Sequence, residues 1–265
     1  MARSAAFFDL DRTLMAGSSG MAWAKAAWEA GMVSRSQMLR WGKDGLVFRL
    51  RGSTDETTRD AMERIKEVLN GASARELERL GPRVLAEVLP RIYPQMLDEV
   101  YSHRDEGRAT FIVSAAGNDL VALVAQVLGM EGGVGTRYEI DAGGNLTGEL
   151  DGPFMYGKGK LEGIRRFADS HEIDLAESWA YSDSASDLPM LRAVGNAVVV
   201  NPDTELSEVA RAEGWRVMRF EKLGRRLAVA AATLTALAVG GGAATVLRRR
   251  APAPASSRLR LRLRR

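Results

Sequence analysis

The sequence predicts an α/β fold in which a parallel β-sheet lies between layers of helices. Apolar runs of strand length, each ending in polar or turn residues, recur along the chain at residues 5–10, 109–114, 178–182 and 197–200. The segments between the later runs have helical periodicity, as Leu120, Val124 and Val127 illustrate. Strands that alternate with helices are typical of a parallel sheet.

A long segment without strand-like runs separates the first two predicted strands. It covers residues 15–100 and contains two helix-like stretches, at 60–69 and 74–89. We therefore predict a helical cap inserted after the first strand. The sheet domain then consists of residues 1–14 and 101–221.

One further β element is predicted downstream of this sheet's second strand. In residues 135–150 the character of the side chains alternates on both sides of the turn residues Gly143 and Gly144. This pattern predicts a hairpin on the margin of the sheet.

The composition excludes several classes of protein. The chain of 265 residues is 46% hydrophobic, with 37 basic and 34 acidic side chains, two histidines and no cysteine. These values exclude collagen-like, wholly disordered and disulfide-stabilised proteins. Thiol nucleophiles, iron–sulfur clusters and zinc–thiolate sites are also excluded, and two histidines are too few for most zinc sites. Any metal site should therefore use oxygen ligands and hold a hard cation.

The charge is distributed unevenly along the chain. Residues 222–265 carry eleven basic and no acidic side chains, so the net charge of +3 leaves −8 for residues 1–221. The positive net charge therefore comes from the basic tail, and it gives little information about the charge of a substrate that the acidic body would bind.

The tail has the length of a membrane segment. Residues 227–247 form 21 residues without a charge between arginine clusters, and about 1.5 Å per residue is enough to span ~30 Å of hydrocarbon. Eight alanines, three glycines and three threonines make insertion marginal. We interpret 222–250 as a hydrophobic membrane segment with basic flanks, and 251–265 as a Pro/Ala linker with an arginine-rich end. The alternative is an alanine-rich helix packed on the body or left loose.

The location of the tail follows from its charges. The four residues before the first strand leave no room for a signal peptide, so we expect a cytoplasmic catalytic domain, attached to the inner face of the plasma membrane. A full span would place the last arginines outside, against the positive-inside tendency. Shallow insertion around 240–242, with both arginine clusters on anionic lipid, avoids this conflict. We do not expect nucleic acid to be a partner, because no aromatic residue interleaves with the arginines.

Paired acidic residues follow two of the predicted strands. Asp9 and Asp11 lie two residues apart at the end of the first strand, with Thr13 shortly after, and Asp183 and Asp187 follow the third strand. Such carboxylates suit a Mg²⁺ site with an acid/base residue. Each pair alone also fits an acidic turn that caps a helix.

A hydroxyl and a lysine-containing run lie at two other edges. Ser114 ends the second predicted strand and precedes Ala115, so a hydroxyl and backbone amides at a helix start could bind phosphate. Lys158 and Lys160 open a later helix in a Gly-Lys-Gly-Lys run. Taken alone, Ser114 also fits an N-cap and the lysines fit a solvated surface. Because the carboxyl ends of parallel strands meet at one edge of a sheet, we expect all these residues to converge.

In this order the four groups resemble the motifs of the haloacid dehalogenase superfamily, and within it subfamily IB, the phosphoserine-phosphatase-like branch. The resemblance covers roughly residues 5–220 and implies a Rossmann-like sheet with a helical cap. Lys160 is preferred to Lys158 because it lies 23 residues before Asp183 and has the GxGK form of this branch. The matching residues are Asp9, Asp11 and Thr13 in the first motif, Ser114 in the second, Lys160 in the third, and Asp183 and Asp187 in the fourth.

The resemblance implies a Mg²⁺-dependent phosphatase that hydrolyses a phosphomonoester through an aspartyl-phosphate. Asp9 would be the nucleophile and Asp11 the general acid and base. Mg²⁺ would be held by Asp9, by the backbone carbonyl of Asp11 and by Asp183, and Asp187 would fix the lysine or a metal-bound water. The groups implied to bind the phosphoryl oxygens are Thr13, Ser114, Ala115 and Lys160.

Three positions differ from the pattern of the family. Arg12 lies where relatives often have a small residue, and Ser182 replaces the usual glycine. Ser18 lies where phosphoserine phosphatases carry a glutamate for the substrate ammonium, so phosphoserine is disfavoured and a small metabolite or membrane-associated phosphate is expected. Two alternatives stay open: a catalytically weak regulatory or scaffold protein acting at the membrane, and a phosphotransferase that uses the same aspartyl-phosphate. Neither a P-loop nor a dinucleotide-binding motif occurs.

Other notable side chains lie outside the motifs. His103 and His171 occur among polar residues, and we expect both to be solvated at the surface. Trp23, Trp28 and Trp41 fit either the substrate face of the cap or its core.

Overall fold

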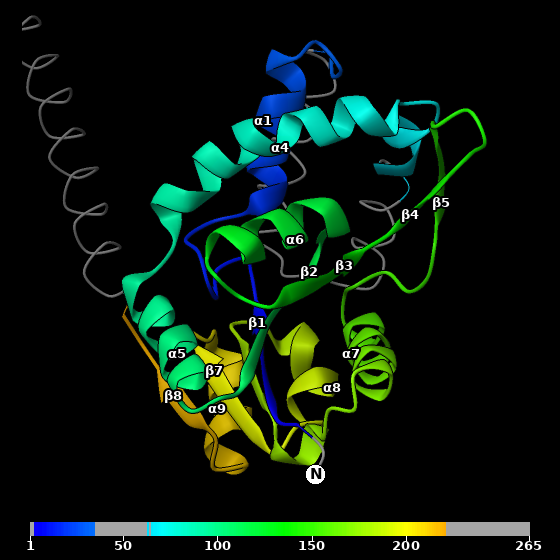
Figure 1. Cartoon of the computed structure of the whole chain (residues 1–265). Helices are drawn as coiled ribbons and strands as arrows, with labels where there is room; N and C mark the ends of the chain where they lie inside the picture. The colour runs from blue at the N-terminus through cyan, green and yellow to red at the C-terminus, as the bar shows by residue number, and fades with distance from the viewer. Residues whose placement is uncertain (1–2, 35–62, 64, 221–265) are drawn as a thin grey trace, which may run out of the picture. The chain divides into compact units, whose positions relative to one another are not determined.

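The computed structural model describes residues 3–34, 63 and 65–220 (Figure 1). The chain divides into two units, Met1–Arg219 and Phe220–Arg265, and the fold below is that of the first. The predicted membrane segment 222–250 and the tail 251–265 lie outside the described residues, as does Trp41.

A six-stranded parallel sheet forms the centre of the first unit, which confirms the predicted α/β class. The strand order is β3-β2-β1-β6-β7-β8. The chain therefore moves outward from β1 in one direction and then returns to continue from β6 in the other. The strands are β1 (Ala5–Asp9), β2 (Ala109–Gly117), β3 (Gly132–Thr136), β6 (Trp179–Ser182), β7 (Asn196–Val200) and β8 (Arg216–Met218).

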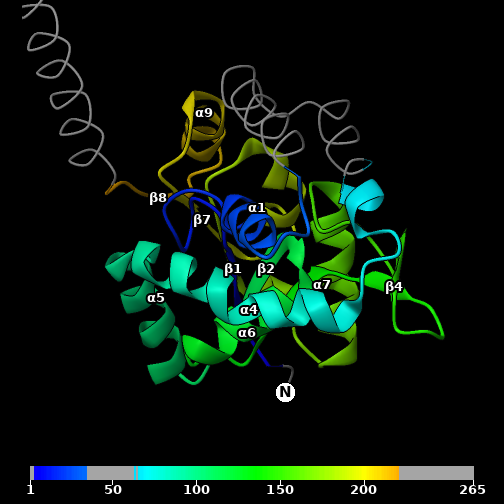
Figure 2. The same ribbon diagram turned by 90° about the horizontal axis from the view of Figure 1, so that it is seen from above.

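Helices cover both faces of this sheet, and Figure 2 shows α5 and α9 on opposite sides of β1 and β7. On one face Phe8 packs against His103 of α5, and on the other Phe111 packs against Phe167 of α7. Alternate residues of the buried strands thus supply two apolar layers. The helices are α5 (Pro94–Asp105) and α6 (Asn118–Val127), then α7 (Lys158–Ser170), α8 (Leu188–Leu191) and α9 (Thr204–Ala212), with 3₁₀ turns at η2 (Leu175–Glu177) and η3 (Ala185–Asp187).

The described residues between β1 and β2 form helices, and no strand of the six-stranded sheet occurs among them. Helices α1 (Ser19–Glu29) and α4 (Ala74–Val88) pack on each other beyond the carboxyl end of β1 (Figure 1). A short helical stretch at 65–69 and η1 (Leu89–Arg91) complete the described part of this cap. The predicted boundary at residue 100 falls inside α5, which packs on β1 and β2.

The chain enters and leaves the cap through two paired segments. Ala16 N–H donates to the Arg91 carbonyl at 2.8 Å, and Tyr93 N–H donates to the Leu14 carbonyl at 2.9 Å. The two crossings between sheet domain and cap are thereby held together as a short antiparallel pair. This pairing fixes where α1 begins relative to the end of β1.

The prediction of a hairpin on the sheet margin is wrong in its placement. The edge strands of the main sheet are β3 and β8, whereas β4 (Tyr138–Ile140) and β5 (Leu146–Leu150) form a separate two-stranded sheet. The turn of that hairpin pairs with the cap, where Ala74 N–H donates to the Gly144 carbonyl. Strand β3 has no apolar pattern, because its glycines lie against α6: a Cβ on Gly133 would come within 2.3 Å of Val121.

No helix in the described part of the chain has the length and apolar character needed to cross a membrane.

The expectation for His103 is also wrong, because its side chain is only 4% exposed. Its Nε2 lies 2.8 Å from the Tyr181 hydroxyl, which in turn donates to Glu99, and Arg108 Nε donates to its Nδ1 at 2.7 Å. The residues flanking it in sequence are polar, but α5 turns this one position toward the sheet. His171 is exposed, as expected.

Acid should weaken the fold through His103. Burial, supported by the charge of Arg108, lowers the pKa of His103 to about 4. The unfolded chain therefore binds the proton first, so stability that is present above about pH 6.5 is lost as the pH falls toward 4, on the order of 2 kcal/mol. Denaturant unfolding of the wild type and of His103→Gln at pH 7 and 4.5 measures this difference.

The exposed His171→Gln variant is the control and should follow the wild type. Equal pH dependence of wild type and His103→Gln would contradict the assignment.

Candidate active site

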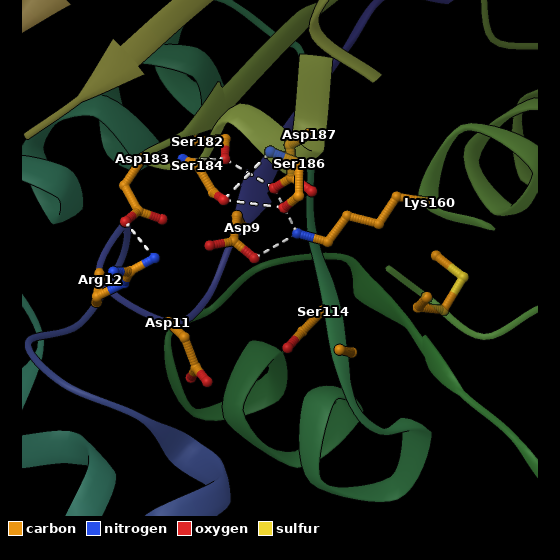
Figure 3. Close-up of polar contacts among 12 residues, drawn as sticks. Asp9, Asp11, Arg12, Ser114, Lys160, Ser182, Asp183, Ser184, Ser186 and Asp187 are labelled. Carbon is orange, nitrogen blue, oxygen red and sulfur yellow. Dashed lines mark hydrogen bonds and ion pairs between the residues drawn. The ribbon is translucent and has the colours of Figure 1, made fainter. Parts of the chain in front are cut away.

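The predicted site residues converge where the strand order reverses, between β1 and β6. Asp9 ends β1 and Asp183 directly follows β6, and these strands are neighbours in the sheet. Ser114 lies on β2, next to β1 on the other side, and Lys160 comes from the first turn of α7. Figure 3 shows these side chains gathered around Asp9. Ligands of open α/β sheets bind in such a crevice.

The centre of the site is a buried ion-pair cluster. Lys160 Nζ donates to Asp9 Oδ1 at 2.5 Å and to Asp187 Oδ2 at 2.7 Å. Asp9 is 6% exposed, Asp187 2% and Lys160 3%, so solvent screens these ion pairs weakly. One lysine thus holds the carboxylates of two separate segments.

The charges of this cluster remain unbalanced. Burial, only partly offset by Lys160, raises the pKa of Asp9 to about 6. Burial and the nearby Asp9 raise the pKa of Asp183 to about 8. Burial alone would lower the pKa of Lys160, but attraction by Asp187 and Asp9 raises it above its usual range. The carboxylates therefore lack positive charge, whereas the lysine stays protonated.

The Gly-Lys-Gly-Lys run is explained by the close approach of its backbone to neighbouring loops. Gly157 has φ +55°, in the left-handed region that favours glycine, and a Cβ on Gly159 would lie 1.8 Å from the Phe154 carbonyl oxygen. These two positions bring the start of α7 against the preceding loop. Lys160 then points into the cluster, whereas Lys158 is exposed.

Arg12 contributes a second cation. It has φ +62°, an unusual conformation for a residue with a side chain, and its Nη2 lies 3.0 Å from Asp183 Oδ2. Glycine, which has no Cβ, would adopt this turn more readily. The guanidinium is largely exposed, so the pair neutralises Asp183 from the solvent side.

Ser182 provides a link within the loop after β6. Its hydroxyl donates to Asp187 Oδ2 at 2.7 Å and accepts from Ser184 N–H at 3.2 Å. A glycine at this position would lack both bonds. The serine therefore fixes the carboxylate that holds Lys160.

Asp11 points toward the start of the cap helix α1. Its Oδ1 accepts from the Ser19 N–H at 2.8 Å, and its Oδ2 accepts from the Ser18 hydroxyl at 3.2 Å. The backbone loop that carries Asp11 is closed by Leu14 N–H, which donates to the Asp9 carbonyl. Asp9 and Asp11 therefore have different partners although they are two residues apart.

The small polar groups expected to bind phosphate lie at the same edge. Ser114 is buried, and its Oγ accepts from Ala116 N–H at 3.2 Å. The carbonyl of Ala115 accepts from the Thr136 hydroxyl, which fixes the backbone after Ser114. Thr13 Oγ1 is buried without a hydrogen-bond partner among the described residues. An unsatisfied buried hydroxyl favours a ligand at this point.

The donors fit a Mg²⁺ ion. Asp9 and Asp183 carry hard oxygen donors, and their raised pKa values show that burial disfavours their negative charge unless a cation is near. Asp187 Oδ1 is buried without a partner in the described ranges. No group of three or more His, Asp or Glu side chains among residues 3–34, 63 and 65–220 is arranged as a metal site. Two carboxylates, a backbone carbonyl such as that of Asp11, and water would meet the usual needs of Mg²⁺.

Comparison with known protein families identifies the family to which this fold belongs. Residues 6–192 match the family model described as haloacid dehalogenase-like hydrolase. The chain belongs to this family. The matched range contains every predicted site residue, from Asp9 to Asp187.

Individual proteins are similar to this chain over most of their length. The chain is 36% identical to an "Inhibition of morphological differentiation protein" of Streptomyces azureus, over 83% of this chain and 79% of that one. It is 32% identical to a phosphoserine phosphatase, SerB1, of Mycobacterium tuberculosis, over 85% and 73%. A crystal structure of a protein of unknown function from Bordetella pertussis Tohama I matches with a TM-score of 0.71 and 28% identity, over 82% and 99%.

Some contributors to the site were not expected from the sequence. The motifs indicate the acids, the lysine and Ser114, but not the contacts of Asp11 with Ser18 and Ser19 or the bond from Ser182 to Asp187. The bond from Ser182 could have been suspected, because a hydroxyl stands where glycine is usual. The contacts of Asp11 could have been suspected from the two serines at the start of an apolar helix, although such serines also fit an ordinary helix start.

Removal of Lys160 should destabilise the protein. Lys160→Met leaves Asp9 and Asp187 buried without their cation, and breaking a buried pair in this way costs about 3 kcal/mol. Urea unfolding at pH 8 without added metal measures the loss.

Lys158→Met is the matched control, because Lys158 is exposed, and it should stay within about 0.5 kcal/mol of the wild type. Similar stability of both variants would show that the cluster does not support the fold.

Proposed function

We propose that the protein hydrolyses phosphomonoesters through an aspartyl-phosphate on Asp9. The observation that carries this proposal is the position of Asp9, which ends β1 at the strand-order reversal and lies 2.5 Å from the buried Lys160. A carboxylate beside a fixed cation, in a site that also holds Asp11 and Ser114, fits nucleophilic attack on an anionic phosphate. Membership of a hydrolase family and the printed name of the phosphatase relative support the same chemistry.

The proposed reaction has two steps. An Asp9 oxygen attacks phosphorus, the bond from phosphorus to the leaving oxygen breaks, and Asp11 gives its proton to that oxygen. Asp11 then takes a proton from water, whose oxygen attacks phosphorus and returns Asp9 as a carboxylate. Asp9, Asp183 and the Asp11 carbonyl would hold Mg²⁺, which supplies positive charge that offsets repulsion between the carboxylate and the phosphate.

Phosphate recognition is assigned to groups that surround Asp9. Lys160 supplies a charge, Ser114 and Thr13 supply hydroxyls, and Ala115 supplies a backbone amide. Asp187 positions Lys160 through the 2.7 Å bond. Each of these groups is held by the sheet edge or by a helix start, so the site needs little reorganisation to bind a phosphoryl group.

Phosphoserine is not the substrate that this site favours. Ser18, at the position expected to bind an ammonium group, bears no charge, and its hydroxyl contacts Asp11. We propose a small metabolite or a membrane-associated phosphomonoester instead.

Phosphate release should depend on Mg²⁺ and on Asp9. The full-length protein should release phosphate from members of a phosphomonoester panel with Mg²⁺ and lose this activity in EDTA. Asp9→Asn should lower turnover by at least about 10³-fold, because the covalent step is lost, while circular dichroism stays unchanged.

A folded Asp9→Asn protein with wild-type activity would overturn the nucleophile assignment. Metal-independent turnover would overturn the proposed role of Mg²⁺.

We also propose that residues 222–265 bind an anionic membrane surface and keep the catalytic domain at the inner face of the plasma membrane. Eleven basic side chains and an uncharged run of 21 residues support this proposal.

The full-length protein should sediment with vesicles that contain phosphatidylserine more strongly than with neutral vesicles, and high salt should weaken binding by screening the arginines. Replacing the arginines at 248–250 and 258–265 with glutamine is the matched control. Equal sedimentation with both kinds of vesicle would contradict the electrostatic contribution.

A further inference from the structure

The start of α1 departs from the usual chemistry of a helix N-terminus. Ser18 is the N-cap residue, yet its hydroxyl makes no hydrogen bond to the amides of its own helix. It donates instead to Asp11 Oδ2 at 3.2 Å, while the Ser19 N–H donates to Asp11 Oδ1 at 2.8 Å. Asp11 thus provides the cap that Ser18 ordinarily would, and the serine hydroxyl is used on the aspartate.

These two bonds join the sheet domain to the cap. Asp11 lies in the turn that follows β1, and Ser18 and Ser19 begin α1, beyond the paired crossing segments at Leu14–Ala16 and Arg91–Tyr93. The orientation of the Asp11 carboxyl group is therefore set by where α1 begins.

The Ser19 N–H and the Ser18 hydroxyl differ in the protonation states of Asp11 to which they can bond. A backbone N–H only donates, so Asp11 Oδ1 is the oxygen least suited to carry a proton while it is bonded to Ser19. A hydroxyl donates to a carboxylate and accepts from a carboxylic acid. Ser18 can therefore keep its bond to Oδ2 in both protonation states of Asp11. This geometry places the exchangeable proton on Oδ2.

We propose that Ser18 is a positioning residue for the proton transfer of Asp11, acting together with the Ser19 amide. The inference rests on the proposed phosphatase function. In the first step the Oδ2–H bond turns from the Ser18 oxygen to the leaving oxygen, and the proton passes to that oxygen as the bond between phosphorus and the leaving oxygen breaks. The Ser18 hydroxyl then rotates from acceptor to donor and bonds to the carboxylate. In the second step Oδ2 takes a proton from the attacking water and the hydroxyl rotates back.

The substrate's leaving group distinguishes this role from a structural one. An alkyl phosphate such as glycerol 2-phosphate needs a proton on its leaving oxygen, whereas p-nitrophenyl phosphate leaves as a stable phenolate. Loss of proton positioning therefore affects the alkyl ester more than the aryl ester. A general loss of folded or phosphate-binding protein affects both esters alike.

The experiment measures kcat and KM of the full-length protein with both esters. Ser18→Ala removes the hydroxyl, and Ser18→Gly removes it while keeping a residue that helix N-caps tolerate. Ser18→Thr retains the hydroxyl and tests rescue. Ser102→Ala is the matched control, because Ser102 is an exposed serine on α5.

We expect Ser18→Ala and Ser18→Gly to lower the ratio of alkyl to aryl kcat/KM by about tenfold or more, mainly through kcat. Ser18→Thr and Ser102→Ala should keep the wild-type ratio. An unchanged ratio in both Ser18 variants, with or without an equal loss for the two esters, overturns the inference. Wild-type turnover that persists in Asp9→Asn overturns the proposed function itself, so the two failures are distinguishable.

Discussion

The ammonium group of Lys160 lies between the carboxylates of Asp9 and Asp187, and the geometry of the whole site depends on this contact. It ties the end of β1 to the start of α7 and to the loop after β6, three segments that the fold brings to one edge. Asp9, Asp183 and Asp187 bring three carboxyl groups to this edge, whereas Lys160 and Arg12 bring two cations, and burial raises the pKa of Asp9 to about 6 and that of Asp183 to about 8. Such a group of buried oxygens favours the binding of a cation, and Lys160 holds the Asp9 carboxylate in place.

Several residues around the cluster adopt conformations or contacts that local preferences disfavour. Arg12 has a positive φ, the N-cap serine Ser18 bonds to Asp11, and Gly159 packs directly on a carbonyl. The sheet itself follows ordinary rules, with apolar strands in the centre and helices on both faces. Departures of this kind are expected where the demands of a site compete with those of the fold.

The central strands and the motif residues could be predicted from the sequence because each has a local signal. Buried strands read as apolar runs, and the acids at their ends have characteristic spacings. Strand β3 has no such signal, since its glycines are required by contact with α6 and not by a pattern of its own. His103 could not be placed either, because its burial depends on how α5 turns toward Tyr181, which lies 78 residues later. Contacts of this type depend on tertiary packing alone.

The position of β1 in the centre of the sheet has a consequence for the order of folding. Both of its neighbours, β2 and β6, come later in the chain, and Lys160 follows Asp9 by 151 residues. At about 5–20 residues per second, synthesis leaves the apolar side chains of Phe7 and Phe8 without their final sheet partners for roughly ten to thirty seconds. During translation the nascent chain therefore carries an unpaired hydrophobic strand, which makes this segment a natural target for chaperones.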